Sequence, residues 1–215
     1  LKDDHDSPIL LQENIVLIAK NNNGYKNLCS LISKSHQNQA KRSYLPIENL
    51  LSCCVDDIFA IQPMRGVIRK DSRNIKFSQM LKEYFDDRLF LTISRHLHHA
   101  EDSWIRPTLE LSRKLDIPYL FSQDVFFHSP NQKIMSDLLA SIKSNKQLED
   151  AQKYFFPNGE RSLHKLDYLD GIYSLLPGYE VALKKSKILA ESIDFCYSSL
   201  RYHYPNEMIP KGYSA

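Results

Sequence analysis

The sequence is poor in several features that would assign a class at once. It contains only 6 Gly and 10 Pro in 215 residues, which excludes a collagen-like or low-complexity chain. Its apolar stretches, such as residues 15–19, are far too short to span a bilayer, and we expect no membrane segment. The sequence also has no Walker-type loop, G-x-G-x-x-G, G-x-S-x-G or H-E-x-x-H motif. The enzyme classes that these motifs usually indicate are therefore not supported by the sequence.

The chain also lacks a large excess of positive or negative charge. The chain has 28 Lys+Arg against 26 Asp+Glu, a formal net charge of +2, so nothing draws it as a whole toward nucleic acid. Short basic runs do occur, in two loops and along the last predicted helix, at Lys41, Arg42, Arg65, Arg69, Lys70, Arg73, Lys184, Lys185 and Lys187. They are interspersed with acids and are compatible with phosphate contacts, whereas base readout has no support.

The cysteines indicate the cellular compartment that we expect, and the N-terminus indicates that the chain is part of a longer polypeptide. The four cysteines, Cys29, Cys53, Cys54 and Cys196, have no C-x-x-C spacing, and the adjacent pair suits neither a zinc site nor an ordinary disulfide. We therefore expect reduced thiols in a cytoplasmic protein. The chain begins with neither Met nor a signal pattern, which leads us to expect a segment from inside a longer polypeptide.

What is present is an alternation of short apolar strands and amphipathic helices. The hydrophobic fraction of 42% and the charged fraction of 25% are those of a globular protein. Strands are predicted at residues 15–19, 57–62, 89–93 and 118–127. A helical pattern follows each strand, which predicts an α/β fold with a parallel sheet or barrel. In such folds the working face lies at the carboxyl ends of the strands.

The clearest helix start lies after the fourth strand. Ser129 is the predicted N-cap, Pro130 suits the first helical position, and Gln132 completes an S-x-x-Q capping box. One broad apolar face then follows, made of Ile134, Met135, Leu138, Leu139 and Ile142. A last helix is predicted to place Tyr179, Ala182, Leu183, Leu189, Ala190 and Ile193 on one side.

Four residues at the ends of the strands are candidate metal ligands. Asp124 and His128 follow the fourth strand, where a carboxylate and an imidazole can hold a divalent metal or orient a phosphate. Alternatively, Asp124 satisfies loop amides and His128 is a surface residue. His96 and His98 follow the third strand in an H-x-H-H run, which fits either metal ligands or a solvated loop.

Three segments of the chain, at residues 17–33, 117–125 and 135–142, follow a known pattern. They resemble the polymerase-and-histidinol-phosphatase (PHP) domain of bacterial C-family DNA polymerases, the DNA polymerase III alpha-subunit type. Residues 17–33 read L-I-A-K-N-N-N-G-Y-K-N-L-C-S-L-I-S and resemble its L-A-K-N-x-x-G-Y-x-N-L-x-x-L segment. Residues 117–125 resemble its L-P-x-V-A-x-x-D-V-H strand, and residues 135–142 its D-x-L-x-x-I helix.

Two later segments are similar to the error-prone subfamily. Residues 158–163 read N-G-E-R-S-L and resemble its N-x-E-R-x-L stretch. Residues 200–212 read L-R-Y-H-Y-P-N-E-M-I-P-K-G and resemble its L-R-Y-x-Y-P-x-E-x-x-P-x-G exit from the PHP domain. The matches occur in the family's order along nearly the whole chain.

The resemblance implies a PHP-type (β/α)7 TIM-like barrel, here incomplete because its first strands would precede Leu1. Residues 1–199 would be the later part of the PHP domain, and residues 200–215 a linker toward the polymerase core. Because sheet edges and apolar faces would then be exposed, we expect the isolated chain to be poorly soluble or oligomeric.

Two departures from the family pattern bear on the metal site. Phe126 stands where the family's D-V-H has its His, and Phe cannot ligate a metal. The strand ending at Pro63 lacks the Cys often found there in replicative members. The resemblance therefore implies a weakened site for Zn²⁺ or Mn²⁺, with Asp124, His128, His96 and His98 as the remaining candidates.

The resemblance implies an error-prone DNA polymerase acting in DNA repair, replication past damage and translesion synthesis. Catalysis would use Mg²⁺ in a palm outside this chain, which would itself hold no catalytic residue and be inactive alone. The implied partners are palm and thumb domains of the same polypeptide, primer–template DNA and a sliding clamp. The alternatives are a metal-dependent PHP phosphoesterase or 3′–5′ proofreading nuclease, and an α/β interaction module without catalysis.

Overall fold

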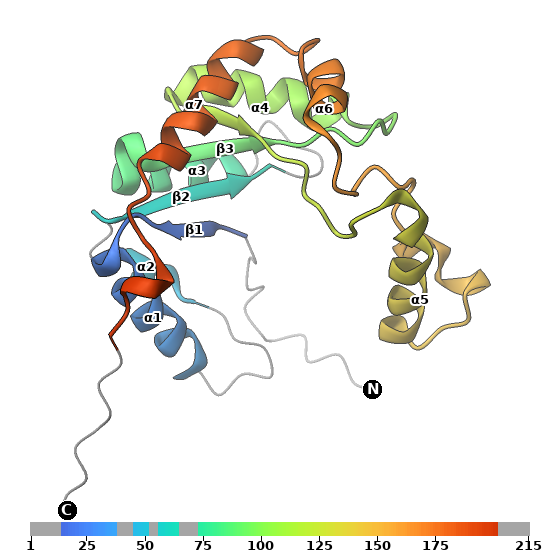
Figure 1. Ribbon diagram of the computed structural model, residues 1–215, viewed down its shortest axis with the longest axis horizontal. Helices are drawn as coiled ribbons and strands as arrows, with labels where there is room; N and C mark the ends of the chain where they lie inside the picture. The colour runs from blue at the N-terminus through green and yellow to red at the C-terminus, as the bar shows by residue number, and fades with distance from the viewer. Residues whose placement is uncertain (1–13, 38–44, 52–55, 65–72, 202–215) are drawn as a thin grey trace, which may run out of the picture.

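The computed structural model describes residues 14–37, 45–51, 56–64 and 73–201. Figure 1 shows the helices and strands. In chain order they are β1 (Val16–Ala19), α1 (Asn22–Gln37), α2 (Ile47–Leu51), β2 (Ile58–Pro63), α3 (Arg73–Phe85), η1 (Asp86–Arg88), β3 (Leu89–Ile93), α4 (Asp102–Leu115), β4 (Tyr119–Phe121), η2 (Pro130–Gln132), α5 (Lys133–Ser144), η3 (Glu149–Tyr154), α6 (Leu166–Tyr173), α7 (Tyr179–Glu191) and η4 (Tyr197–Ser199).

Within the described residues the strands form one open sheet in the order β1-β2-β3-β4. Strands β2, β3 and β4 are parallel, and β3 is buried at every position. A strand can be apolar on both sides only where both faces of the sheet are covered. In Figure 1, α7 crosses the near face, whereas α3 and α4 lie behind the sheet. The α/β class predicted from the sequence is confirmed.

Two of the three buried apolar clusters hold the helices on the two faces of the sheet. The larger one lies between the sheet and α1 to α4, and its buried members include Leu31, Leu50, Leu81, Phe85, Leu91 and Leu111. The smaller one lies under α7 and is made of Phe59, Phe90, Leu120 and Leu189. Alternate residues of β3 thus face opposite layers, as the period of a strand requires.

The direction of β1 differs from the prediction. It runs antiparallel to β2, with Ala19 opposite Ile58, instead of starting a parallel β-α unit. The chain leaves β1 and enters β2 at the same end of the sheet, where the amide of Lys20 donates to the carbonyl of Asp57 at 2.8 Å. Helical periodicity between two strands does not reveal at which end the chain re-enters the sheet.

The N-N-N-G run explains the start of α1. The side-chain oxygen of Asn21 accepts hydrogen bonds from the amides of Asn23 and Gly24, both at 3.0 Å, and its amide donates to Asp57 at 2.6 Å. A Cβ at residue 24 would lie 2.1 Å from the carbonyl oxygen of Asp57. Glycine is required because the helix approaches the start of β2 so closely.

The fourth strand and the following helix start also differ from the prediction. Only Tyr119–Phe121 of the predicted 118–127 is a strand, because Asp124, at φ 48°, turns the chain out of the sheet. Ser129 makes no capping hydrogen bond through its side chain, so the predicted capping box is wrong. Pro130 begins a 3₁₀ turn, and α5 starts only at Lys133.

Several predictions lie partly outside the described residues. The linker was assigned to residues 200–215, and its residues from 202 onward lie outside the described part of the chain. Cys53 and Cys54 also lie outside it. Cys29 and Cys196 are free thiols. The described part of the chain contains no helix with the length and apolar character needed to cross a membrane.

Candidate functional site

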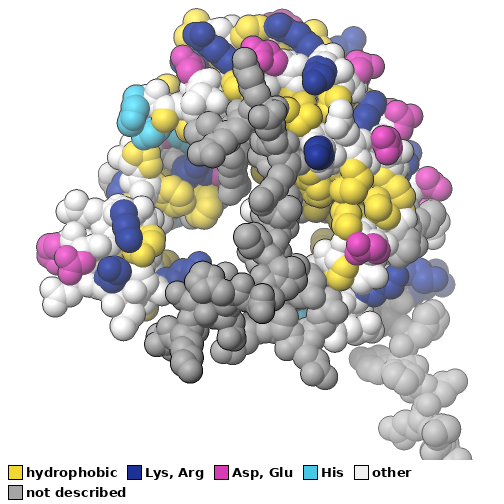
Figure 2. Space-filling model, turned by 180° about the vertical axis from the view of Figure 1, so that it is seen from behind, with side chains coloured by type: hydrophobic (Ala, Val, Ile, Leu, Met, Phe, Trp, Pro, Cys, Tyr) yellow, Lys and Arg dark blue, Asp and Glu magenta, His cyan; other side chains and the backbone are white. Residues whose placement is uncertain are grey.

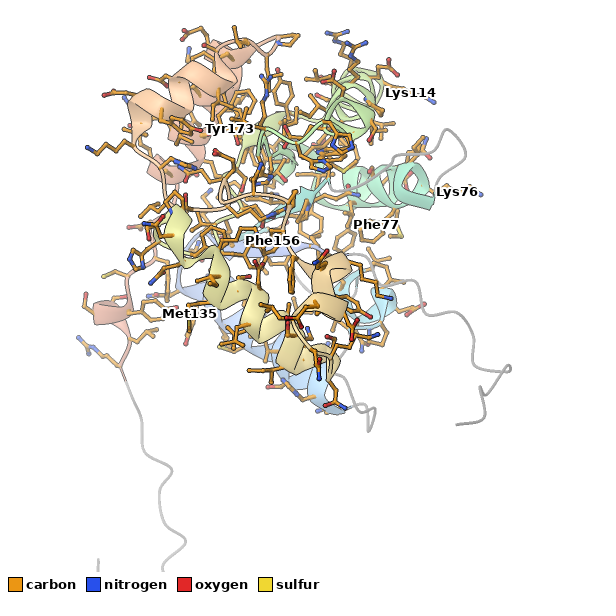
Figure 3. All side chains as sticks on the ribbon, turned by 90° about the vertical axis from the view of Figure 1, so that its right-hand side faces the viewer. Lys76, Phe77, Lys114, Met135, Phe156 and Tyr173 are labelled. Atoms are coloured by element: carbon orange, nitrogen blue, oxygen red, sulfur yellow. The ribbon has the colours of Figure 1, made fainter. Side chains whose placement is uncertain are left out.

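The carboxyl ends of β3 and β4 lead into two sharp turns. Leu97 and Asp124 have φ values of 53° and 48°, a region that residues with a side chain rarely adopt. After β4 the chain leaves the sheet as an excursion, defined here as residues 125–163, which contains η2, α5 and η3 (Figure 1). Figure 3 faces this excursion, with Met135 and Phe156 labelled on it. The end of the excursion returns to the same two turns. The polar side chains that meet there are called the polar cluster, and they include His96, Asp124, Glu160, Arg161 and Tyr173.

His96 is the most deeply buried imidazole candidate in this cluster. Its backbone amide donates to the carboxylate of Glu101, and its Nε2 lies 2.8 Å from the carbonyl oxygen of Gln123. Because a carbonyl can only accept, Nε2 carries the proton. Burial lowers the pKa of His96 below 6.5, which favours the neutral ring. His96 therefore ties the end of β3 to the end of β4.

Asp124 faces a guanidinium in the same cluster. Its Oδ2 forms an ion pair with Arg161, and the two side chains are only 12% and 20% exposed. The guanidinium carbon of Arg161 lies 5.5 Å from the ring centre of Phe126 and 4.7 Å from that of Phe156. The cation is thus held by a carboxylate and by two aromatic faces.

Glu160 makes a second set of contacts in the last segment of the excursion, where the chain returns to the sheet. It accepts a hydrogen bond of 2.8 Å from Tyr168 and lies 3.3 Å from Nε2 of His164. Burial raises the pKa of Tyr168, and the hydrogen bond to Glu160 raises it further. The amide of His164 donates to Gln123 at 3.2 Å, which brings this set to the end of β4.

Tyr173 of α6 closes the cluster from the other side (Figure 3). Its hydroxyl donates to the carbonyl of Ser122 at 2.9 Å and accepts from the amide of Arg95 at 3.1 Å. Burial raises the pKa of Tyr173 to about 12, so the phenol stays protonated and keeps donating. One hydroxyl therefore connects the residues that follow β3 and β4.

The predicted metal ligands are brought only partly together. Asp124 and His96 both belong to the cluster, although each is engaged as described above. His98 lies against His99, with ring centres 4.2 Å apart, and accepts from the amide of Ala100. His128 is exposed beyond Phe127. Among the described residues no group of three or more His, Cys, Asp or Glu side chains is suited to hold a metal ion.

Sequence reasoning did not assign a role to the residues that build the cluster from the excursion. Asn158, Glu160 and Arg161 each make one of its contacts, and all three belong to the N-G-E-R run. That run was recognised only as a family resemblance. Three polar side chains at such spacing, at the end of a long excursion, are the signal that points to a contact with the strand ends.

Only part of the predicted basic runs falls within the described residues. On the face shown in Figure 2, basic and acidic side chains are intermixed. Lys184, Lys185 and Lys187 are exposed on α7, whereas residues 41, 42, 65, 69 and 70 lie outside the described part of the chain.

The chain was compared with curated proteins and with family models. It is 29% identical over 202 residues to the error-prone DNA polymerase of Pseudomonas aeruginosa, a match that covers 93% of this chain and 18% of that protein. The error-prone DNA polymerase of Pseudomonas paraeruginosa is 29% identical over 199 residues, with 93% and 18% covered. That of Ralstonia nicotianae is 26% identical over 206 residues, with 92% and 19% covered.

The chain is thus similar to error-prone DNA polymerases over more than nine-tenths of its length. The resemblance predicted from five separate motifs is thereby confirmed. The chain spans about a fifth of the length of these polymerases, and no family model matches it.

Proposed function

We propose that this chain is the PHP-domain segment of an error-prone C-family DNA polymerase and serves as a scaffold for the polymerase core. The similarity to error-prone polymerases over 93% of the chain carries this proposal. The complete protein would perform templated nucleotidyl transfer with Mg²⁺ in its palm, on primer–template DNA and with a sliding clamp, in the cytoplasm. The described sheet would be part of a PHP-type barrel.

The exposed face of α5 supports the scaffold role. Ile134, Met135, Leu138, Leu139 and Ile142 line one side of this helix and are 45–67% exposed. Five large apolar side chains on one helix face are rarely left in water. We assign the rest of the same polypeptide as the partner that covers them, because the related polymerases are about five times longer than this chain.

Primer extension by the complete polypeptide that carries this chain tests the activity. With Mg²⁺ and a primed template, we expect incorporation of the complementary nucleotide. Failure to extend the primer under these conditions, by a folded protein, would contradict the polymerase assignment.

Paired substitutions in that complete protein test the scaffold role. Leu138→Glu with Ile142→Glu is expected to lower both the melting temperature and the primer-extension rate, because two charges would enter the contact with the core. The matched control is Leu166→Glu, since Leu166 is 76% exposed on α6. If the α5 variant melts and extends primers as the control does, the α5 face is not the contact.

A further inference from the structure

Asp124 supplies the carboxylate that directly follows β4. In the PHP pattern a His follows two residues later, and the two side chains ligate a metal. Here Phe126 holds that place, and its ring lies against Arg161 instead. Since divalent cations bind where several oxygen or nitrogen donors converge, a carboxylate facing a guanidinium is a poor ligand set. The residues present do not fit a metal at this position.

Arg161 is held by more than its ion pair. Its backbone carbonyl accepts from the amide of Phe126 at 2.8 Å and from that of Phe127 at 3.3 Å. Its guanidinium carbon lies 5.5 Å from the ring centre of Phe126 and 4.7 Å from that of Phe156, and the two ring centres are themselves 4.7 Å apart, so the cation lies against both rings of a contacting pair. Backbone and side chain of one residue therefore both bind the turn after β4, which fixes the guanidinium next to Asp124.

The ion pair also joins two distant parts of the sequence. Asp124 directly precedes the excursion, whereas Arg161 stands near its end, 37 residues later. A parallel bridge between Phe127 and Ser162 lies beside the pair. Whatever neutralises Asp124 therefore also closes the loop that presents α5.

We propose that Arg161 takes the place of a metal ion in this chain, so that its guanidinium, packed against the rings of Phe126 and Phe156, neutralises Asp124 and holds the excursion to the end of β4, a contact called the clasp below. The statement that a metal would otherwise stand there rests on the proposed function. The clasp itself rests only on the contacts above, and its test requires no polymerase activity.

Thermal melting of the 215-residue chain with EDTA and with added Mn²⁺ or Zn²⁺ tests the first half of the proposal. We expect the same Tm in all three conditions, because the cation is part of the protein. A wild-type Tm that falls with EDTA, with the dependence lost in Asp124→Asn, would overturn the proposal, since a metal would then be bound at this carboxylate.

A double-mutant cycle tests the second half. Arg161→Gln is expected to lower Tm by roughly 6–12 °C, because a desolvated carboxylate is left without its partner, and adding Asp124→Asn is expected to restore part of that loss. Arg161→Lys, which keeps the charge but not the planar guanidinium, should lie between wild type and Arg161→Gln.

The matched control is Arg106→Gln, because Arg106 pairs with Asp102 on the surface of α4 with both side chains 77% exposed. We expect it to shift Tm very little. Additive effects of the two substitutions in the cycle, or equal effects of Arg161→Gln and Arg106→Gln, would overturn the clasp. Should Arg161→Gln fail to fold, Arg161→Lys with and without Asp124→Asn provides the same comparison. These melting results do not depend on primer extension. A complete protein that fails to extend a primer would therefore count only against the proposed function.

Discussion

The side-chain amide of Asn158 donates a hydrogen bond of 2.6 Å to the backbone carbonyl of His96 across 62 residues of sequence. The side-chain oxygen of Asn158 also accepts from the amide of Glu160 at 3.1 Å. One asparagine thus shapes the turn at the end of the excursion and attaches that turn to the end of β3.

The first prediction separates these two contacts of Asn158. Asn158→Ala loses both and is expected to cost about 1–2 kcal/mol of unfolding free energy, because the carbonyl of His96 is left without this donor. Asn158→Asp keeps the acceptor for Glu160 but loses the donor. Urea denaturation should rank both variants below wild type. If Asn158→Asp is as stable as wild type, the bond to His96 does not hold the excursion.

The second prediction concerns the close approach of α1 to β2. Gly24→Ala is expected to lose at least about 1–3 kcal/mol of stability, since its Cβ would lie 2.1 Å from a backbone oxygen that cannot swing away. Gly171→Ala in α6 is the control, because nothing lies within 4 Å of its Cβ. It is expected to gain roughly 0.5–1 kcal/mol from helix propensity. Chemical denaturation of both variants checks the opposite signs, and a stable Gly24→Ala would contradict the packing described.

The third prediction is a dependence of stability on pH that originates at His96. Because burial lowers its pKa in the folded chain below 6.5, the unfolded chain takes up the proton first as pH falls. The contribution of the neutral ring is complete above pH 6.5 and is lost as the pH falls from there through the lowered folded-state pKa. The slope from this one group is at most about 1.4 kcal/mol per pH unit.

His96→Gln should flatten that slope, because the amide of Gln can still donate to a carbonyl but does not titrate in this range. Denaturation curves between about pH 5 and pH 8 check this. His36→Gln, a change at the exposed end of α1, is the control that removes an imidazole elsewhere. An identical slope in wild type and His96→Gln would refute the assignment to His96.

The fourth prediction concerns the isolated chain and the exposed face of α5. Leu139→Lys with Ile142→Lys is expected to reduce self-association, because these side chains are 63% and 67% exposed and make the helix face apolar. Each change should alter the unfolding free energy by no more than about 0.5 kcal/mol, as is usual at exposed positions. Light scattering and denaturation measure the two effects. Leu189→Lys, at a position of α7 that is only 8% exposed and packs against the sheet, should instead destabilise the fold strongly. Unchanged association of the double variant would show that another surface is responsible.

The sequence by itself determined the local elements and the resemblance of the chain to error-prone DNA polymerases. The buried strand Leu89–Ile93 and the amphipathic helix Asp102–Leu115 follow from periodicity and from the side-chain chemistry of short segments. The family resemblance likewise rests on short runs of residues and needs no contacts between them. These features were predictable because each is encoded within a few consecutive residues.

Only the tertiary structure decided which distant residues meet. The antiparallel direction of β1 depends on where the chain re-enters the sheet, and the early end of β4 depends on the turn at Asp124. The pairing of Asp124 with Arg161 spans 37 residues, and no periodicity links the two. The sequence identified Asp124 as a candidate metal ligand because carboxylates bind cations. The fold brings a guanidinium to it, because the excursion returns to the end of β4 and places Arg161 against two aromatic rings.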